Sequence, residues 1–233
     1  MKKLIIAAII VLFAATISQA VTIDELFAKL KDNQGKIKDM QADVTTKMVS
    51  NAKGMKEMTQ KGHIWTKGKD KSKMEITSPQ KQISITNGTK VAMIMPDTGQ
   101  KYVQDLSKTP EGQKQESGQM DFEKAKEKFN FSVKDVSRGF LIIGFPKGNN
   151  KLMGKMEVFV NSSKLVPEEI RVFGANNKKI SDTRIEYKEI KGILVASRSF
   201  SMVSMPNGEM KIDMVYDNIK INENIPDSVF DVN

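Results

Sequence analysis

The chain has 233 residues but no cysteine, only one histidine and only one tryptophan. Without cysteine there is no disulfide framework, so the folded state must depend on apolar burial and backbone pairing. The same absence excludes cysteine metal sites, and a single histidine excludes histidine-rich ones. The acidic residues do not follow the spacing of a calcium loop. We therefore predict a protein with no metal and no cofactor.

Catalytic patterns are equally scarce. A Ser–His–Asp triad would have to use His63, which lies in a strand-like segment with no nucleophile elbow nearby. Glu168 and Glu169 form an acidic pair, but adjacent residues of a strand point to opposite faces. We predict a binding protein and not an enzyme. An envelope hydrolase that uses His63 remains an alternative.

The first twenty residues have the pattern of a secretory signal peptide. Two lysines precede an apolar run over residues 4–17, and residues 18–20 place small side chains where signal peptidase reads them. The run is too short and too poorly flanked for a stable membrane span. We expect cleavage after residue 20 and a single soluble domain over 21–233 in a bacterial periplasm. A retained N-terminal anchor is the alternative.

Charge and methionine content distinguish the remainder of the chain. Without Lys2 and Lys3, 35 basic residues stand against 28 acidic ones, a net charge of +7. This mild excess suits anionic lipid head groups, and an ordinary solvated basic surface is the alternative. Nucleic acid is not an expected partner, because no basic block is interleaved with aromatic residues. The 15 methionines suit either an adaptable apolar surface or gaps in a core.

Two short helices are expected. Thr22 and Glu25 form a capping box, and helical spacing of apolar residues follows it. This first helix should end before Gly35, where glycine terminates the pattern. A second helix is expected over residues 121–130. Their apolar faces are Ile23, Leu26, Phe27 and Leu30 in the first, and Phe122 and Phe129 in the second.

Most of the chain has the period of two that is typical of strands. A long polar loop is expected over residues 105–119, and no period of 20 to 50 residues repeats. The pattern predicts a mainly β (α+β) fold with about ten antiparallel strands in a meander. A sheet of that size must curl and cover one face. We expect a curved, incompletely closed half-barrel with the short helices on its concave side.

The hairpin around residues 87–89 can be given a register from its apolar residues. A two-residue loop at Asn87-Gly88 would place Ile85 opposite Lys90 and bury a lysine. A three-residue loop pairs Ile85 with Val91 and puts the apolar residues of both strands on one face. We predict the longer loop, with a shared face formed by Ile83, Ile85, Val91, Met93 and Met95.

The hairpin around Asn207 and Gly208 permits a two-residue loop. That loop pairs Met205 with Met210 and gathers methionines on one face, which favours an adaptable apolar surface. The predicted face consists of Val203, Met205, Met210, Ile212 and Met214.

The order of these segments resembles that of the LolA-type periplasmic outer-membrane lipoprotein carriers and the wider LolA–LolB-like superfamily. Residues 62–67, Gly-His-Ile-Trp-Thr-Lys, are similar to the family's Gly-x-(Leu/Ile)-Trp-x-Lys strand. Residues 79–96 resemble its strand, Asn-Gly turn, apolar strand and proline, and residues 225–230 resemble its closing segment. The similarity covers nearly the whole chain after residue 20.

The resemblance implies an incompletely closed antiparallel barrel with a helical lid. It also implies a carrier that shields the acyl chains of lipoproteins between inner and outer membranes. The implied partners are an acylated lipoprotein or lipid and transient protein partners in both membranes, with the carrier a monomer. In the carriers an arginine after the Trp-x-Lys strand tethers the lid, whereas this chain has Gly68 there, between Lys67 and Lys69.

An acyl chain of roughly 16 carbons costs on the order of 13 kcal/mol to leave in water, so a carrier needs an apolar concave face. We predict a lid made of Ile23, Leu26, Phe27, Leu30, Phe122 and Phe129. We predict a cavity floor made of Ile83, Ile85, Val91, Met93, Met95, Val203, Met205, Met210, Ile212 and Met214. A dry core is the alternative for these residues. An envelope regulatory or protein-interaction module of RseB-like type is the alternative function.

Overall fold

The computed structural model describes residues 21–52, 54, 56–108, 122–148 and 153–232. The predicted signal peptide lies outside these ranges, as does most of the predicted polar loop. Within them, no helix combines the length and the apolar character that crossing a membrane requires.

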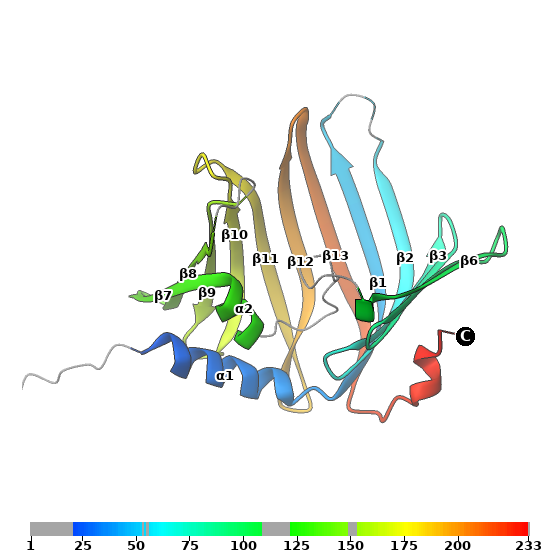
Figure 1. The fold of residues 1–233 in the computed structure, drawn as a ribbon, viewed down its shortest axis with the longest axis horizontal. Helices are drawn as coiled ribbons and strands as arrows, with labels where there is room; N and C mark the ends of the chain where they lie inside the picture. Colours follow the sequence, from blue (N-terminus) through cyan, green and yellow to red (C-terminus); the bar gives the residue numbers. More distant parts are fainter. Residues whose placement is uncertain (1–20, 53, 55, 109–121, 149–152, 233) are drawn as a thin grey trace, which may run out of the picture.

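The described residues form one antiparallel sheet of thirteen strands, in the order β6-β5-β4-β3-β2-β1-β13-β12-β11-β10-β9-β8-β7 (Figure 1). The first strand therefore pairs with the last, and two meanders run outward from this pair. The two edges, β6 and β7, do not meet, which confirms the predicted open, curved half-barrel. The strands are β1 (Asp39–Ser50), β2 (Met58–Lys67), β3 (Lys71–Ser78), β4 (Gln82–Asn87), β5 (Lys90–Met95), β6 (Gln100–Asp105), β7 (Phe129–Val136), β8 (Gly139–Pro146), β9 (Lys155–Asn161), β10 (Val166–Phe173), β11 (Lys179–Ile190), β12 (Ile193–Met205) and β13 (Gly208–Ile221).

The strand count exceeds the expected ten. Strand β6 had no clear sequence signal, because all six of its residues are exposed and it forms an edge of the sheet. Strands at an edge need no apolar face, so alternation of apolar residues does not reveal them.

The first predicted helix is confirmed as α1 (Ile23–Gly35), although it includes Gly35 instead of ending before it, and its capping box is formed. The Thr22 amide donates to Glu25 Oε2 at 2.9 Å, and the Glu25 amide donates to Thr22 Oγ1 at 3.3 Å. The second helix, α2 (Phe122–Lys128), is shorter than expected. Phe129 belongs to β7 instead, where Phe129 pairs with Pro146.

The predicted register of the β4–β5 hairpin is wrong. Asn87 pairs with Lys90 across a two-residue turn at Gly88 and Thr89, and Ile85 pairs with Ala92. Gly88 has a φ of +62°, a left-handed conformation that suits glycine. Opposite residues of an antiparallel pair share a face, so Ile83 and Ile85 lie on one face and Val91, Met93 and Met95 on the other. The prediction failed because both faces of this hairpin carry apolar residues.

The β12–β13 hairpin has other residue pairs than predicted, but its apolar residues share one face as predicted. Met205 pairs with Gly208, and Val203 pairs with Met210. The turn is displaced, and each partner moves by two residues, which returns side chains to the same face. Val203, Met205, Met210, Ile212 and Met214 therefore share one face, as expected.

Two hydrophobic clusters lie on opposite faces of the sheet. The helical-side cluster joins Leu26, Phe27 and Leu30 of α1 to Phe122 and to β8 and β9. The outer cluster is formed where the chain after β13 folds back onto β4 and β5, ending in the short helix η3 (Asp227–Phe230). We call the face under α1 the concave face and the one under η3 the outer face. The helix η3 contacts β3 and β4 and is the red helix at the lower right of Figure 1.

Candidate functional site

A cavity of about 360 Å³ lies between α1 and the concave face of the sheet. It is partly open, and most of its surface is apolar. Both halves of the sheet contribute to it, from β2 and β3 across β13 and β12 to β8. Its apolar walls include Phe27, Leu30, Phe122, Phe131, Ile142, Met156, Val158 and Ile170. The volume falls within the range of roughly 300–1,000 Å³ that is typical of small-molecule sites.

The C-terminal turn of α1 is fixed above this cavity by Asn33, whose hydrogen-bond partners are far away in the sequence. Asn33 Nδ2 donates to the carbonyl oxygen of Leu165 at 3.0 Å and to that of Lys164 at 3.5 Å. Both carbonyls belong to the turn between β9 and β10. The arginine tether of the carriers is absent here, and this amide contact holds the helix to the sheet.

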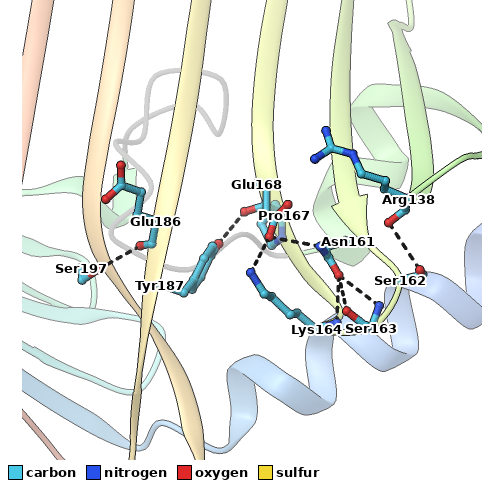
Figure 2. A network of polar contacts seen from close by, with 10 residues as sticks. All are labelled: Arg138, Asn161, Ser162, Ser163, Lys164, Pro167, Glu168, Glu186, Tyr187 and Ser197. Carbon is cyan, nitrogen blue, oxygen red and sulfur yellow. Dashed lines mark hydrogen bonds and ion pairs between the residues drawn. The ribbon is translucent and has the colours of Figure 1, made fainter.

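The β9–β10 turn is itself organised by Asn161 (Figure 2). Asn161 Oδ1 accepts hydrogen bonds from the Ser163 amide at 3.0 Å and the Lys164 amide at 3.1 Å. Its Nδ2 donates to Glu168 Oε1 at 3.2 Å, and Lys164 Nζ lies 2.9 Å from the same oxygen. Leu165 then adopts a φ of +51°. These contacts fix the turn, so that its Lys164 and Leu165 carbonyl oxygens point toward Asn33 of α1.

The N-terminal half of α1 is held against α2. Lys126 Nζ of α2 lies 2.7 Å from Asp24 Oδ1, and the pKa of Lys126 is raised by its hydrogen bond to that carboxylate. The Phe27 ring packs between Phe122 and Phe131, with centroid distances of 4.9 and 5.1 Å. The two helices therefore form one cover over the β7–β10 end of the cavity.

Two half-buried tyrosines also line the cavity. Tyr187 donates its hydroxyl hydrogen to the Pro167 carbonyl at 2.6 Å, a contact that Figure 2 shows across β10 and β11. Tyr216 donates to Met214 Sδ at 2.8 Å. Burial raises the pKa of both phenols. Both therefore stay neutral at physiological pH, with their hydroxyl hydrogens used inside the protein.

The opposite end of the cavity is formed by the tight turn between β2 and β3. The Gly68 amide donates to the Lys38 carbonyl at 2.9 Å, and the φ of Gly68 is +61°. Beside it, Lys67 Nζ and Lys71 Nζ lie 2.6 and 2.9 Å from the two carboxylate oxygens of Asp227. These two ammonium groups lower the pKa of Asp227 to about 2. Gly68, Lys69 and Lys71 all line the cavity.

The Gly-x-Ile-Trp-x-Lys segment has a structural explanation. A Cβ atom on Gly62 would lie 2.3 Å from the Glu75 carbonyl oxygen, so no larger residue fits there without a backbone shift. Ile64 lines the cavity, while Trp65 packs with the outer cluster. Lys67 donates to the Ile225 carbonyl at 2.7 Å. The segment therefore connects the cavity to the C-terminal segment on the outer face.

The predicted lid residues are mostly brought together. Leu26, Phe27, Leu30 and Phe122 form one buried cluster, and Ile23 packs against it. Of these, Phe27, Leu30 and Phe122 line the cavity. Phe129 lies on β7 and contacts Phe131, with ring centroids 5.7 Å apart.

The ten predicted floor residues are all described, and none of them lines this cavity. Ile85 is buried in the outer cluster, where Ile83 packs against it beside Trp65 and Phe230. The other eight share the concave face with the cavity but lie farther along the strands. Met93 is the most open of them, with 42% of its surface exposed.

His63 lies on the outer face. Its Nδ1 is 2.7 Å from Asp43 Oδ1, and its ring stacks on Trp65 with centroids 4.2 Å apart. The Nε2 atom is buried and has no hydrogen-bond partner within the described part of the chain. The described residues also include no group of three or more histidine or acidic side chains able to hold a metal ion.

Several lining residues were missed by sequence reasoning. Tyr187 and Tyr216 were overlooked because they sit in strands whose neighbouring residues are charged. Asn33 was missed because its partner is 132 residues away. An Asn-Ser-Ser-Lys turn before a strand does signal a structured Asx turn, but nothing local identifies the helix that it holds.

Comparison with solved structures shows a LolA-like fold. A LolA superfamily protein from Nitrosomonas europaea superimposes with a TM-score of 0.62 at 16% identity, covering 91% of this chain and 98% of that one. A DUF1329 family protein from Desulfovibrio piger gives 0.63 at 12% identity, covering 90% and 97%. An outer membrane lipoprotein-sorting protein domain from Vibrio parahaemolyticus gives 0.60 at 11% identity, covering 88% and 95%.

Sequence comparison identifies a family, whereas the solved structures show only the fold. No curated protein has a significant sequence match to this chain. A family model described as "Sporulation protein YdcC-like" matches residues 1–194, which is most of the chain. The chain therefore belongs to the YdcC-like family of sporulation proteins.

Proposed function

We propose that this protein binds an acyl chain of a lipid or lipoprotein and shields it from water as an exported carrier. The observation that carries the proposal is the apolar cavity of about 360 Å³ between α1 and the concave face. A compact protein without a ligand would be expected to close such a space, because empty apolar volume is destabilising. The protein acts in this proposal by binding and not by catalysis.

The energetics favour an acyl chain as the occupant. Burial of each methylene is worth about 0.8 kcal/mol, so a chain of many methylenes gains most from an apolar enclosure. The walls supply aromatic rings from α1, α2 and β7, and flexible Met156 from β9. Methionine adapts to irregular apolar shapes. Beyond the cavity, the concave face continues into the predicted floor residues of β5, β12 and β13, which could receive a longer chain.

The likeness to a lipoprotein-sorting domain agrees with this proposal in fold only. A role in transit between membranes would further require that the exported chain meets a donor and an acceptor membrane protein. The family model is described as a sporulation protein, and this description supports a role during sporulation. We propose that the cargo is an acylated molecule of the cell envelope during that process.

The test is binding of a fluorescent fatty acid to the exported protein, combined with native mass spectrometry of the protein as purified. Thr66 lines the cavity, whereas Thr45 lies on the outer face opposite Val215. Thr66→Phe should fill the space and weaken binding by about tenfold or more, equivalent to at least 1.4 kcal/mol. Thr45→Phe is the matched control and should bind as the unmodified protein does.

A mass adduct that matches an acylated molecule, lost in Thr66→Phe and kept in Thr45→Phe, would support the proposal. A clean apo mass with no fatty acid uptake would contradict it. If the same preparation captured one stable protein partner and no lipid, the regulatory or protein-interaction module would replace the carrier.

A further inference from the structure

We infer that the outer face of strands β7 to β10 is a docking surface for an anionic lipid bilayer. This surface is separate from the cavity, which lies on the concave face of the same strands. The inference goes beyond the proposed function and does not require that the cavity holds a ligand.

Six apolar side chains gather on this outer face. Phe131, Ile142 and Val158 line the cavity on the concave face, and successive residues of a strand point to opposite faces. The outward positions therefore follow from the strand pairing of β7 with β8, β8 with β9 and β9 with β10. The apolar residues at these outward positions are Val136, Leu141, Ile143, Phe145, Phe159 and Phe173.

These side chains lie outside the covered parts of the sheet. None of the six belongs to either hydrophobic cluster of the described residues. Phe145 is 50% exposed and Val136 is 40% exposed. On the outer face of the opposite end, by contrast, η3 contacts β3 and β4 (Figure 1). A group of apolar residues left open on one face is typical of an interaction surface.

Two of the aromatic rings lie beside cationic groups. The guanidinium carbon of Arg138 is 5.6 Å from the ring centroid of Phe159, and Lys155 Nζ is 4.4 Å from that of Phe173. Aromatic rings combined with basic side chains are typical of surfaces that bind at a membrane interface. There the rings enter the apolar boundary while the charged ends stay among the head groups.

Two cations of this face are balanced by two acidic residues of the same face. Lys155 Nζ lies 2.8 Å from Glu157 Oε1. Arg171 pairs with Glu169 on β10. These two ion pairs leave the charge of the face to the remaining basic residues.

Lys134 and Arg138 carry a positive excess. Lys134 is exposed on β7, at an outward position opposite Leu141. Neither side chain forms an ion pair with any residue that the structure describes. Glu168 feels the charge of Arg138, but its carboxylate is bonded to Lys164 at 2.9 Å. Figure 2 shows no contact from the Arg138 guanidinium to the other residues drawn.

An anionic bilayer complements both features of this surface. Its head groups attract Lys134 and Arg138, because basic residues near a negatively charged membrane are bound electrostatically. Its apolar boundary accepts the exposed ring of Phe145, which then leaves water. Since β8 and β9 also carry the apolar wall of the cavity on their concave face, docking would bring the cavity within one sheet thickness of the membrane.

The experiment measures flotation of the exported protein with vesicles of phosphatidylcholine, alone or mixed equally with phosphatidylglycerol. Partition onto the mixed vesicles should be stronger by about tenfold or more, and added salt should reduce it. Lys134→Gln with Arg138→Gln should lower this partition about tenfold, whereas Lys134→Arg with Arg138→Lys should preserve it. Phe145→Ser should lower it about threefold, because only part of the ring leaves water on binding.

Matched controls separate this face from the rest of the molecule. Lys188→Gln with Lys211→Gln removes the same charge at exposed positions of β11 and β13 and should retain vesicle binding. Tyr102→Ser removes an aromatic ring that is 62% exposed on the other edge strand, β6, and should also retain it. Thermal unfolding of each variant establishes that all of them fold.

Equal partition onto both kinds of vesicle, or binding to neither, would overturn the inference. An equal loss in the Lys188 and Lys211 control would also overturn it, because the attraction would then belong to the whole basic surface. A stable protein partner that is lost in Phe145→Ser, without vesicle binding, would make the patch a protein interface instead. Thr66→Phe, which fills the cavity, should leave vesicle binding unchanged, so the proposed function and this inference can fail separately.

Discussion

The sheet is covered on both faces, but the two covers enclose different things. On the concave face, α1 and α2 pack Leu26, Phe27 and Phe122 against β8 and β9, and a cavity remains beside them. On the outer face, the C-terminal segment places Phe230 against Ile85 and Ala92, and no residue of that buried cluster lines the cavity. The difference agrees with our proposal that the concave cover serves binding, whereas the outer cover serves stability.

The largest expected effect tests the outer cover. Phe230 is fully buried, at 0% exposure. Phe230→Ala should lower the free energy of unfolding by about 3–5 kcal/mol, because it removes a ring and leaves a cavity in a filled cluster. Chemical denaturation measures this loss. Fatty acid affinity, measured where the variant is still folded, should not change. A loss below about 1 kcal/mol would show that the segment does not pack as described.

The second prediction tests the concave cover. Leu30 of α1 is 5% exposed and lines the cavity. Leu30→Ala should cost about 2–3 kcal/mol of unfolding free energy, near the low end for such substitutions, because the site already borders open space. It should also change which acyl chain length binds best. An unchanged chain-length profile in the same titration would mean that α1 does not bound the ligand site.

The third prediction concerns the attachment of α1. Asn33→Ala removes the hydrogen bonds to the β9–β10 turn and should cost about 0.5–1.5 kcal/mol. Amide hydrogen exchange in α1 should become faster while exchange in β12 and β13 stays the same, because only the helix is released. Asp32→Ala, at an exposed position of the same helix, is the control and should leave exchange unchanged.

The smallest expected effect is a pH dependence at Asp227. Its pKa is about 2 in the folded protein, held down by Lys67 and Lys71, and the ordinary value is 3.8. A lowered pKa contributes stability above the unfolded-state value, and this contribution is lost as pH falls toward the folded-state value. The Tm difference between the unmodified protein and Asp227→Asn should therefore be constant above about pH 4 and shrink toward pH 2. A difference that grows on acidification would contradict the assignment.

Local sequence signals predicted the parts of this fold that depend on local contacts. The capping box and apolar spacing of residues 22–30 specified α1 and its buried face, because a helix is determined by neighbours a few residues apart. The alternating strands likewise predicted an open, curved antiparallel sheet.

The error in the β4–β5 register has one physical origin, the assumption that only one face of this hairpin is apolar. Val91, Met93 and Met95 face the concave side while Ile83 and Ile85 face the C-terminal segment, so no register could place all five together. The cover on the outer face is a contact between residues more than 130 apart in sequence. Such contacts leave no periodic signal in either segment.

The lining of the cavity was predicted only in part, because several of its strand residues follow no apolar pattern. The apolar face of α1 was identified from its helical spacing. The strand residues that line the cavity beneath α1, among them Tyr187, Tyr216 and Ile170, belong to no helical or methionine pattern that would reveal them. The methionines of β5 and β13 that were predicted as cavity floor lie on the concave face, outside the cavity lining. Their role in accepting a longer chain stays a prediction.

The most direct test of the central claim is methyl NMR of the exported protein with carbon-labelled methionine, titrated with a fatty acid. Met40 and Met156 line the cavity, whereas Met202 lies on the outer face because its neighbour Val203 pairs with Met210 on the concave face. We predict that the methyl signals of Met40 and Met156 shift on titration and that the signal of Met202 does not. Saturable shifts at Met202 with none at Met40 and Met156 would contradict the account.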